Sequence, residues 1–287
     1  MQEIFQKSAK PERVAELRRA GVLSAASFDD YSSLRAFLPA ESLQPLISHY
    51  WVVRWAIPEG VTYRPTEVLA SPMVNIFFMP DEAFLYGLTT QTFEYEARGD
   101  GVMAGVTFQP GGFFPYWRKP MIGLPRHKTA LDLVFPDATR AFSQALLKQS
   151  DEAIAAGIEA LIAKHRITVG PNLGTIAAII RAVSLETRLR SARAVSKHFG
   201  IATRTLQHLF QREVGVSLKW VIMRARLLEA IDEAYRHPKP DWVRIAVDLG
   251  YSSQAHFIAD FRRATGRSPA AFHKAGEGRM VSAASAS

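Results

Sequence analysis

The chain has 287 residues, a length that fits two domains better than one compact core. It has no cysteine, which excludes disulfides, thiolate metal sites and cysteine nucleophiles, and it has no apolar run of the roughly 18 residues that a membrane helix needs. The formal net charge is +8, and residues 181–287 hold all of the excess, with 18 Lys and Arg against 9 Asp and Glu. This asymmetry predicts a polyanionic partner, most readily nucleic acid; a basic surface kept for solubility is the alternative.

Residues 1–40 are predicted to form a helical lead-in segment. Pro11 to Arg19 has the pattern of an amphipathic helix, and Gly21 and a polar stretch follow it. The first residues lack the pattern of a secretory signal. Together with the absence of cysteine, this predicts a cytoplasmic protein without membrane association.

Residues 41–166 are predicted to form a second, β-rich domain with helices. Short β-rich runs separated by Pro, Gly and Asp turns fill the region from His49 to Phe108, the clearest being 50–55, 73–78, 83–86 and 102–108. Strands at this spacing indicate a small antiparallel barrel or sandwich. Two amphipathic helices are expected between Ala138 and Lys164, broken near Ser150, and they either pair two copies in a homodimer or pack on their own barrel. Residues 167–172 are the predicted linker.

A ligand pocket in such a barrel would be apolar with few polar groups. The candidate lining residues are Trp51, Trp55, Asn75, Phe77, Tyr86, Phe93, Phe108, Phe114 and Trp117. Plain core packing is the alternative for each of them. The Pro110-Gly111-Gly112 segment is better explained as a turn than as an anion-binding loop, because no lysine and helix start follow it. The histidines before the basic third are too scattered for a metal site, and no cofactor is predicted.

The basic third of the chain nearly repeats itself at an offset of about fifty residues. The first copy runs from Gly200 through Phe210 to Gly215 and Ser217, and the second from Gly250 through Phe261 to Gly266 and Ser268. In each copy glycine follows the phenylalanine by five residues and serine by seven. An internal repeat indicates a repeated supersecondary unit.

Each copy has the pattern of a helix, a glycine turn and a second helix. Glycine tolerates the left-handed conformation that ends a short helix, and Ser217, Asp241 and Ser268 are placed as N-caps. Such a pair is a helix-turn-helix, whose second helix enters the major groove of DNA. A long helix from Ser217 to about Arg236 would join the two units. The fold class is therefore α+β, with a small antiparallel β-barrel or sandwich and its helices followed by an all-α domain at 173–276 and a disordered tail at 277–287.

The second copy, Gly250-Tyr251-Ser252-Ser253-Gln254-Ala255-His256-Phe257 with Phe261-Arg262-Arg263, Gly266-Arg267-Ser268-Pro269 and Phe272, resembles the signature of AraC-type regulators. The first copy, with Leu206, Phe210, Gly215 and Ser217, is similar to that family's other helix-turn-helix. The resemblance covers about residues 172–275. It implies a ligand-sensing N-terminal domain, and the run from Gly105 to Phe114 resembles a segment of one group of such sensors.

Helical phase and the resemblance together predict which residues touch DNA. Polar side chains for base contacts are Thr203, Arg204, Gln207, His208, Gln211, Ser253, Gln254 and His256. Candidates for phosphate contact are Arg212, Lys219, Arg262 and Arg263, and Arg263 can also reach a base. This chain has Ala259, and also His208, where many family members have arginine. The second unit is therefore expected to rely more on backbone contact and DNA shape than on base contacts.

The sequence thus predicts a non-enzymatic, sequence-specific transcription regulator that binds double-stranded DNA and responds to a small effector. Contact with RNA polymerase is expected if it activates transcription. One alternative is an orphan regulator with a purely structural barrel. Another is an enzyme fused to a DNA-binding domain, but the repair relatives with this helix pair use cysteine nucleophiles, and the chain has none.

Overall fold

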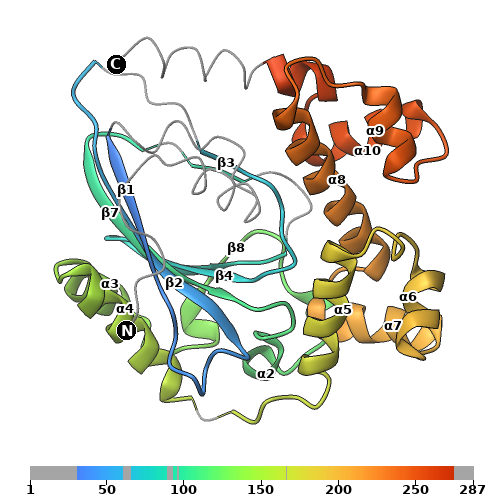
Figure 1. The fold of residues 1–287 in the computed structure, drawn as a ribbon. Coiled ribbons are helices and arrows are strands. Elements are labelled where there is room, and N and C mark those ends of the chain that lie inside the picture. The colour runs from blue at the N-terminus through green and yellow to red at the C-terminus, as the bar shows by residue number, and fades with distance from the viewer. Residues whose placement is uncertain (1–30, 61–65, 89–92, 96, 166, 275–287) are drawn as a thin grey trace.

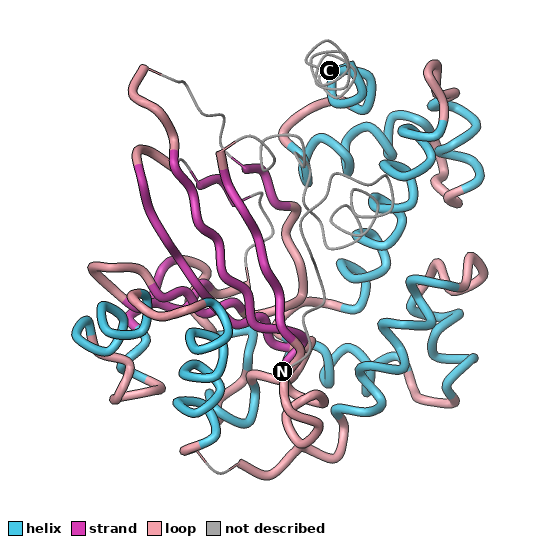
Figure 2. Tube along the Cα trace, turned by 60° about the vertical axis from the view of Figure 1, so that its left-hand side comes forward, coloured by secondary structure: helices cyan, strands magenta, loops and turns pink. Residues whose placement is uncertain are grey.

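The computed structural model describes residues 31–60, 66–88, 93–95, 97–165 and 167–274 (Figure 1). The predicted helix from Pro11 to Arg19 and the predicted tail at 277–287 lie outside these residues. The described chain is an N-terminal β-rich region with helices and a helical C-terminal region, as the sequence predicted. Figure 2 shows the C-terminal helices gathered beyond one side of the strands.

The described residues form eight strands in two antiparallel sheets. The larger sheet has the order β1-β2-β7-β4-β5-β8, and β3 pairs only with β6. Among the described residues no pairing joins β1 to β8, so this sheet is not closed on itself. The strands are β1 (Ser32–Phe37), β2 (Ile47–Ala56), β3 (Thr66–Val68), β4 (Asn75–Phe78), β5 (Ala83–Tyr86), β6 (Phe93–Tyr95), β7 (Asp100–Phe108) and β8 (Lys128–Ala130).

Strand β1 lies in the segment that the sequence analysis assigned to the helical lead-in. It pairs antiparallel with β2 from Ser32 opposite Trp55 to Phe37 opposite Tyr50. The alternation of buried side chains in this strand is weak, and only Ala36 and Phe37 are fully buried. Its conformation is therefore set by the ladder to β2, which is a long-range contact.

The two predicted helices α3 (Arg140–Leu147) and α4 (Asp151–Ala163) cover one face of the large sheet. The hydroxyl groups of Thr139 and Ser150 cap them, and the break falls at Ser150 as expected. Ile154, Ile158 and Leu161 of α4 are buried against the strands. In this structure both helices pack on their own sheet (Figure 1).

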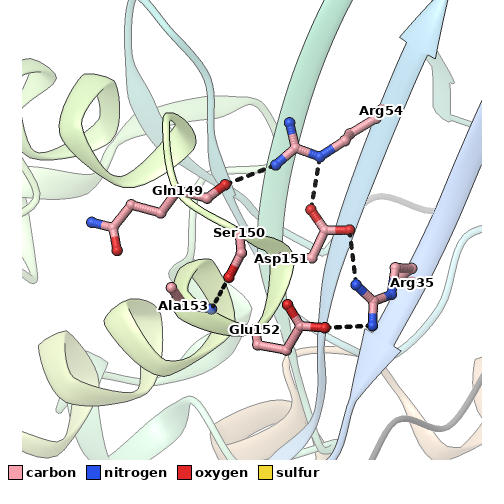
Figure 3. A network of polar contacts seen from close by, with 7 residues as sticks. All are labelled: Arg35, Arg54, Gln149, Ser150, Asp151, Glu152 and Ala153. Atoms are coloured by element: carbon pink, nitrogen blue, oxygen red, sulfur yellow. Dashed lines mark hydrogen bonds and ion pairs between the residues drawn. The ribbon is translucent and has the colours of Figure 1, made fainter.

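A network of ion pairs fastens the start of α4 to β1 and β2 (Figure 3). Asp151 Oδ1 accepts a hydrogen bond from Arg54 Nε at 2.7 Å, and its Oδ2 lies 3.4 Å from Arg35 Nη1. Arg54 Nη2 also donates to the carbonyl of Gln149 at 3.0 Å, and Arg35 Nη2 donates to Glu152 at 2.6 Å. Asp151 is the shared acceptor of both guanidinium groups, and its side chain is only 11% exposed.

We expect Asp151→Ala to lower the free energy of unfolding by about 1–2 kcal/mol, because it removes one shared acceptor from two partly exposed arginines. Urea denaturation followed by circular dichroism measures the loss. Glu152→Ala is the matched control, since Glu152 is 57% exposed and pairs with Arg35 but not with Arg54; it should change stability little. Equal losses in the two variants would contradict a special role for Asp151.

The C-terminal region is helical from residue 173 onward. Its elements are α5 (Leu173–Leu185), α6 (Ala192–Phe199), α7 (Thr203–Leu209), a π-helical segment (Phe210–Val214), α8 (Leu218–Arg236), α9 (Trp242–Asp248) and α10 (Gln254–Thr265). Ser217 and Asp241 cap α8 and α9 as predicted, and Ser268 Oγ accepts from the amide of Ala271 at the start of a further helical turn. Gly200, Gly215, Gly250 and Gly266 all have positive φ, which explains glycine at these four positions.

The N-terminal region and the first part of the C-terminal region share one hydrophobic core. This cluster contains sheet residues such as Ile76 and Val106 and also Ile176, Leu206 and Phe210 of the C-terminal helices. Gly215 lies so close to the N-terminal region that an added Cβ would be 2.3 Å from Leu88 Cδ1 and 2.8 Å from the Met121 carbonyl oxygen. The turn after β7 makes a similar approach, because an added Cβ at Gly111 would be 3.2 Å from Ile176 Cδ1.

The second part of the C-terminal region has a core of its own, which we call the second cluster. It contains Leu227, Ile231, Phe257 and Phe261, and Leu69 is its one member from the N-terminal region among the described residues. Helix α8 runs from the shared core into the second cluster. Between the two clusters, Arg224 of α8 donates from Nε to the carbonyl of Ala70 at 2.6 Å. Its buried Nη2 has no hydrogen-bond partner among the described residues. Burial lowers the pKa of Arg224 to about 10.

Candidate nucleic-acid interface and sensor face

Helices α6 and α7 form the first helix pair, and a turn at Gly200 joins them. Gly200 has a φ of 66° and closes α6 by donating its amide to the carbonyl of Ser196. Leu206 of α7 and the adjoining Phe210 are buried, so the opposite face of α7 is free. That face holds the residues predicted to contact DNA: Arg204, Gln207, His208, Gln211 and Arg212 are exposed and Thr203 is half-buried.

Two features of this helix pair bear on its predicted contact with DNA. Ala202 is the N-cap of α7 and makes no side-chain cap bond, and Thr203 does not replace it because it is the first helical residue. At the other end the Arg212 guanidinium lies 5.8 Å from the centre of the Phe114 ring in the N-terminal region. Arg212, a predicted phosphate contact, therefore also lies at the boundary with the N-terminal region.

Helices α9 and α10 form the second pair around Gly250, whose φ is 73°. The Ser253 hydroxyl caps α10 by accepting from the amide of His256. Phe257 and Phe261 are fully buried, and the opposite face is exposed. This face contains every residue predicted here to contact DNA, together with the two alanines between them: Ser253, Gln254, Ala255, His256, Ala259, Arg262 and Arg263.

A polar group lies along the edge of this exposed face. Asp260 Oδ1 accepts from Arg263 Nη1 at 2.7 Å, and its Oδ2 is 3.6 Å from His256 Nε2. The Ser252 hydroxyl is 3.3 Å from the other ring nitrogen of His256. Asp260 is 13% exposed, whereas the His256 and Arg263 side chains are 54% and 73% exposed.

The face of the large sheet opposite α3 and α4 is the candidate sensor face. The strand pairing places Trp51, Trp55, Asn75, Phe77 and Tyr86 together on it. The indoles of Trp51 and Trp55 lie over Gly105 and Gly101, where an added Cβ would come within 2.3 and 2.2 Å of the respective indole. Five of the predicted lining residues therefore share one surface.

The same face carries a row of polar side chains, of which His49 and Thr107 were not among the predicted lining residues. His49, Thr107, Asn75 and Tyr86 are neighbours across four strands. The Thr107 hydroxyl donates to Asn75 Oδ1 at 2.7 Å. Burial lowers the pKa of His49 to about 4, so its ring is neutral at pH 7. Counting in twos along the strands, from Trp51 to His49 and from Tyr86 to Phe84, would have found both residues; Phe84 stacks on Phe77 with ring centres 5.0 Å apart.

The remaining predicted lining residues do not join this face. Phe108 points to the opposite side of the sheet, where its ring packs 5.1 Å from Phe113, because it is one residue out of phase with Thr107. Phe114 and Trp117 belong to a short helix, α2 (Phe114–Trp117), that packs on the shared core. Phe93 lies in β6, and its side chain is outside the described part.

Within the described residues no group of three or more His, Cys, Asp or Glu side chains could hold a metal ion. None of the described helices is long and apolar enough to span a membrane.

Two family models match parts of the chain. Residues 35–128 match a domain of unknown function (DUF6597), and residues 195–275 match a helix-turn-helix domain. The second match begins within α6 and continues past α10, so it includes both helix pairs. No curated protein matches the chain.

Solved structures resemble parts or most of the chain at low identity. A transcriptional regulator with an AraC-type DNA-binding domain from Chromobacterium violaceum is 24% identical over 36% of this chain and 95% of its own, with a TM-score of 0.31. The C-terminal domain of AraT, a response regulator from Geobacillus stearothermophilus, is 19% identical over 35% and 84%, with a TM-score of 0.32. An apo ToxT variant from Vibrio cholerae is 12% identical over 78% and 96%, with a TM-score of 0.40.

Proposed function

We propose that this chain, whose residues 195–275 match a helix-turn-helix domain, is an AraC-type transcription regulator that binds specific sequences in double-stranded DNA through its two helix pairs. The exposed polar faces of α7 and α10, in the C-terminal third of the chain that holds the whole basic excess, support this most directly. Each buried face of these helices is occupied by leucine and phenylalanine, so only the polar face can meet a partner. The chain acts as a regulator and not as an enzyme.

The two helix pairs are two helix-turn-helix units, and α8 sets the distance between them. A helix of 19 residues is about 28 Å long at 1.5 Å per residue. With the width of the two units added, the reading helices suit successive major grooves, which lie about 34 Å apart on one face of DNA. One polypeptide can therefore contact two half-sites.

Selection of duplexes from a random pool, followed by gel-shift assays at several salt concentrations, tests this function. We expect enrichment of a sequence with two conserved blocks separated by about one helical turn. Log affinity should fall linearly with log salt, since arginines that contact phosphates release counterions. A pool that shows no enriched sequence would refute specific DNA binding.

Gln207→Ala should weaken binding to the selected duplex by about 1–3 kcal/mol, because glutamine can make a bidentate contact with adenine that alanine cannot. Ala259→Gly should weaken it less, since alanine has no polar group to lose at this exposed position. Gel-shift titrations at one salt concentration compare the two variants. Equal losses would contradict a base-reading role for Gln207.

We further propose that the sensor face binds a small effector. Its stacked aromatic rings offer apolar contact, and the row of His49, Thr107 and Asn75 offers neutral hydrogen-bonding groups. A ligand that binds two conformations with different affinity shifts the equilibrium between them, and the coupling to DNA affinity is reciprocal. A thermal-shift screen of small molecules, with the hits repeated on Phe77→Ala, tests the site. If no hit changed DNA affinity, the chain would act as an orphan regulator.

A further inference from the structure

Asp260 is the one acidic residue of α10, the second reading helix, and it sits at the edge of the exposed face. Its side chain is largely covered, and both carboxylate oxygens point at groups on that face. His256, Asp260 and Arg263 follow one another at four and three residues, the spacing at which helical side chains meet. The Asp260 carboxylate therefore contacts two exposed side chains of the same helix, those of His256 and Arg263.

The contact with Arg263 leaves part of the guanidinium available. Arg263 Nη1 donates to Asp260 Oδ1 at 2.7 Å, and guanidinium has five N–H donors in a fixed plane. The carboxylate restricts this plane to few orientations while the other donors stay exposed. An arginine fixed in this way is suited to the two acceptors of a guanine edge in the major groove.

Three neighbouring groups contact the His256 ring, although its side chain is 54% exposed. One ring nitrogen faces the Ser252 hydroxyl at 3.3 Å, the other faces Asp260 at 3.6 Å, and the ring stands edge-on to Tyr251 at 5.3 Å. Histidine therefore serves here as a spacer that keeps the carboxylate oriented. Across the interface with α8, the Arg226 guanidinium lies 5.2 Å from the centre of the Tyr251 ring.

Charge makes this arrangement selective. A carboxylate at the edge of a DNA-binding face repels phosphates, and on a helix with two exposed arginines it opposes non-specific attraction. We propose that Asp260 is a positioning residue that gives the second reading helix its base specificity, by directing Arg263 to a guanine edge and by disfavouring its contact with phosphate. This rests on the proposed DNA-binding function. It also replaces the expectation that the second helix pair relies mainly on contacts with the DNA backbone and on the shape of the DNA.

Asp260→Ala tests the proposal against Asp248→Ala as a matched control. Asp248 lies on α9, is 66% exposed and forms an ion pair with Arg244 at 3.5 Å. Its removal therefore deletes the same charge from the same region without removing a partner of Arg263. We expect the ratio of affinities for the selected duplex and a duplex with one guanine replaced to fall roughly tenfold in Asp260→Ala. The slope of log affinity against log salt should become steeper by about one as Arg263 turns to a phosphate. Both quantities should stay at the wild-type value in Asp248→Ala.

The double variant with Arg263→Gln shows whether Asp260 acts through the arginine. In the Arg263→Gln background, Asp260→Ala should cause no further loss of discrimination; a full loss there would overturn the proposal, as would identical results for the two aspartate variants. Circular dichroism confirms that each variant is folded. Failure of the wild-type chain to select any duplex would instead refute the proposed function, so the two failures are distinguishable.

Discussion

Gly215→Ala is expected to weaken the attachment of the helical region to the N-terminal region and to cost about 2–5 kcal/mol in unfolding free energy. Two effects add. The residue has a φ of 88°, which is unfavourable for alanine by about 1–2 kcal/mol. The added Cβ would also meet Leu88 and the Met121 backbone, which cannot move away without opening the shared core. Urea denaturation followed by circular dichroism and tryptophan fluorescence measures the loss.

Gly266→Ala is the control that separates the two effects. Gly266 occupies the matching position in the second unit with a φ of 74°, but nothing lies within 4 Å of its added Cβ. Only the backbone cost of about 1–2 kcal/mol should therefore appear. If both variants lost the same free energy of unfolding, the close contact of Gly215 with the N-terminal region would contribute nothing to the cost of the substitution.

Phe257→Ala is expected to cost about 3–5 kcal/mol and to act locally. The side chain is fully buried among Tyr251, Phe261 and Trp242, with ring centres 5.4, 5.7 and 6.4 Å away. Because these residues belong to the second cluster, the loss should raise amide hydrogen exchange in α9, α10 and the end of α8 while leaving the strands protected.

Phe210→Ala removes an equally buried ring from the shared core. Its effect should spread to α5, α7 and the strands, because those elements pack in the same cluster. Hydrogen exchange followed by mass spectrometry compares the two variants peptide by peptide. An increase in the strands of Phe257→Ala that matched the increase in Phe210→Ala would show that the two clusters unfold as one.

The helix boundaries of the C-terminal region could be predicted because their signals are local. Ser217, Asp241 and the glycines at 200, 215, 250 and 266 act on backbone groups within a few residues of themselves. Strand β1 could not be predicted in the same way, since its short, weakly alternating sequence takes its conformation from β2. The approach of Gly215 to Met121 likewise depends on a contact between distant parts of the chain.

The candidate sensor face was predictable in part. Choosing residues by type gathered five side chains that share one face of the sheet, but it also took in Phe108, which points to the other side. Parity along the strand separates Phe108 from Thr107, and it would have added His49 and Phe84. The exposed residues of α7 and α10 followed from helical phase, whereas the contacts of Asp260 depend on side-chain conformations that spacing alone does not give.

The small contact between the N-terminal region and the second cluster at α8 has a consequence for the proposed binding to DNA. Among the described residues, Leu69 and the Ala70 carbonyl are what the N-terminal region offers to the second cluster and to Arg224, and one guanidinium nitrogen there has no acceptor. Releasing one leucine costs only about 1.5–3 kcal/mol. The second helix pair is thus held to the N-terminal region by few contacts, and under the proposed function the binding of two half-sites can reposition it at low energetic cost.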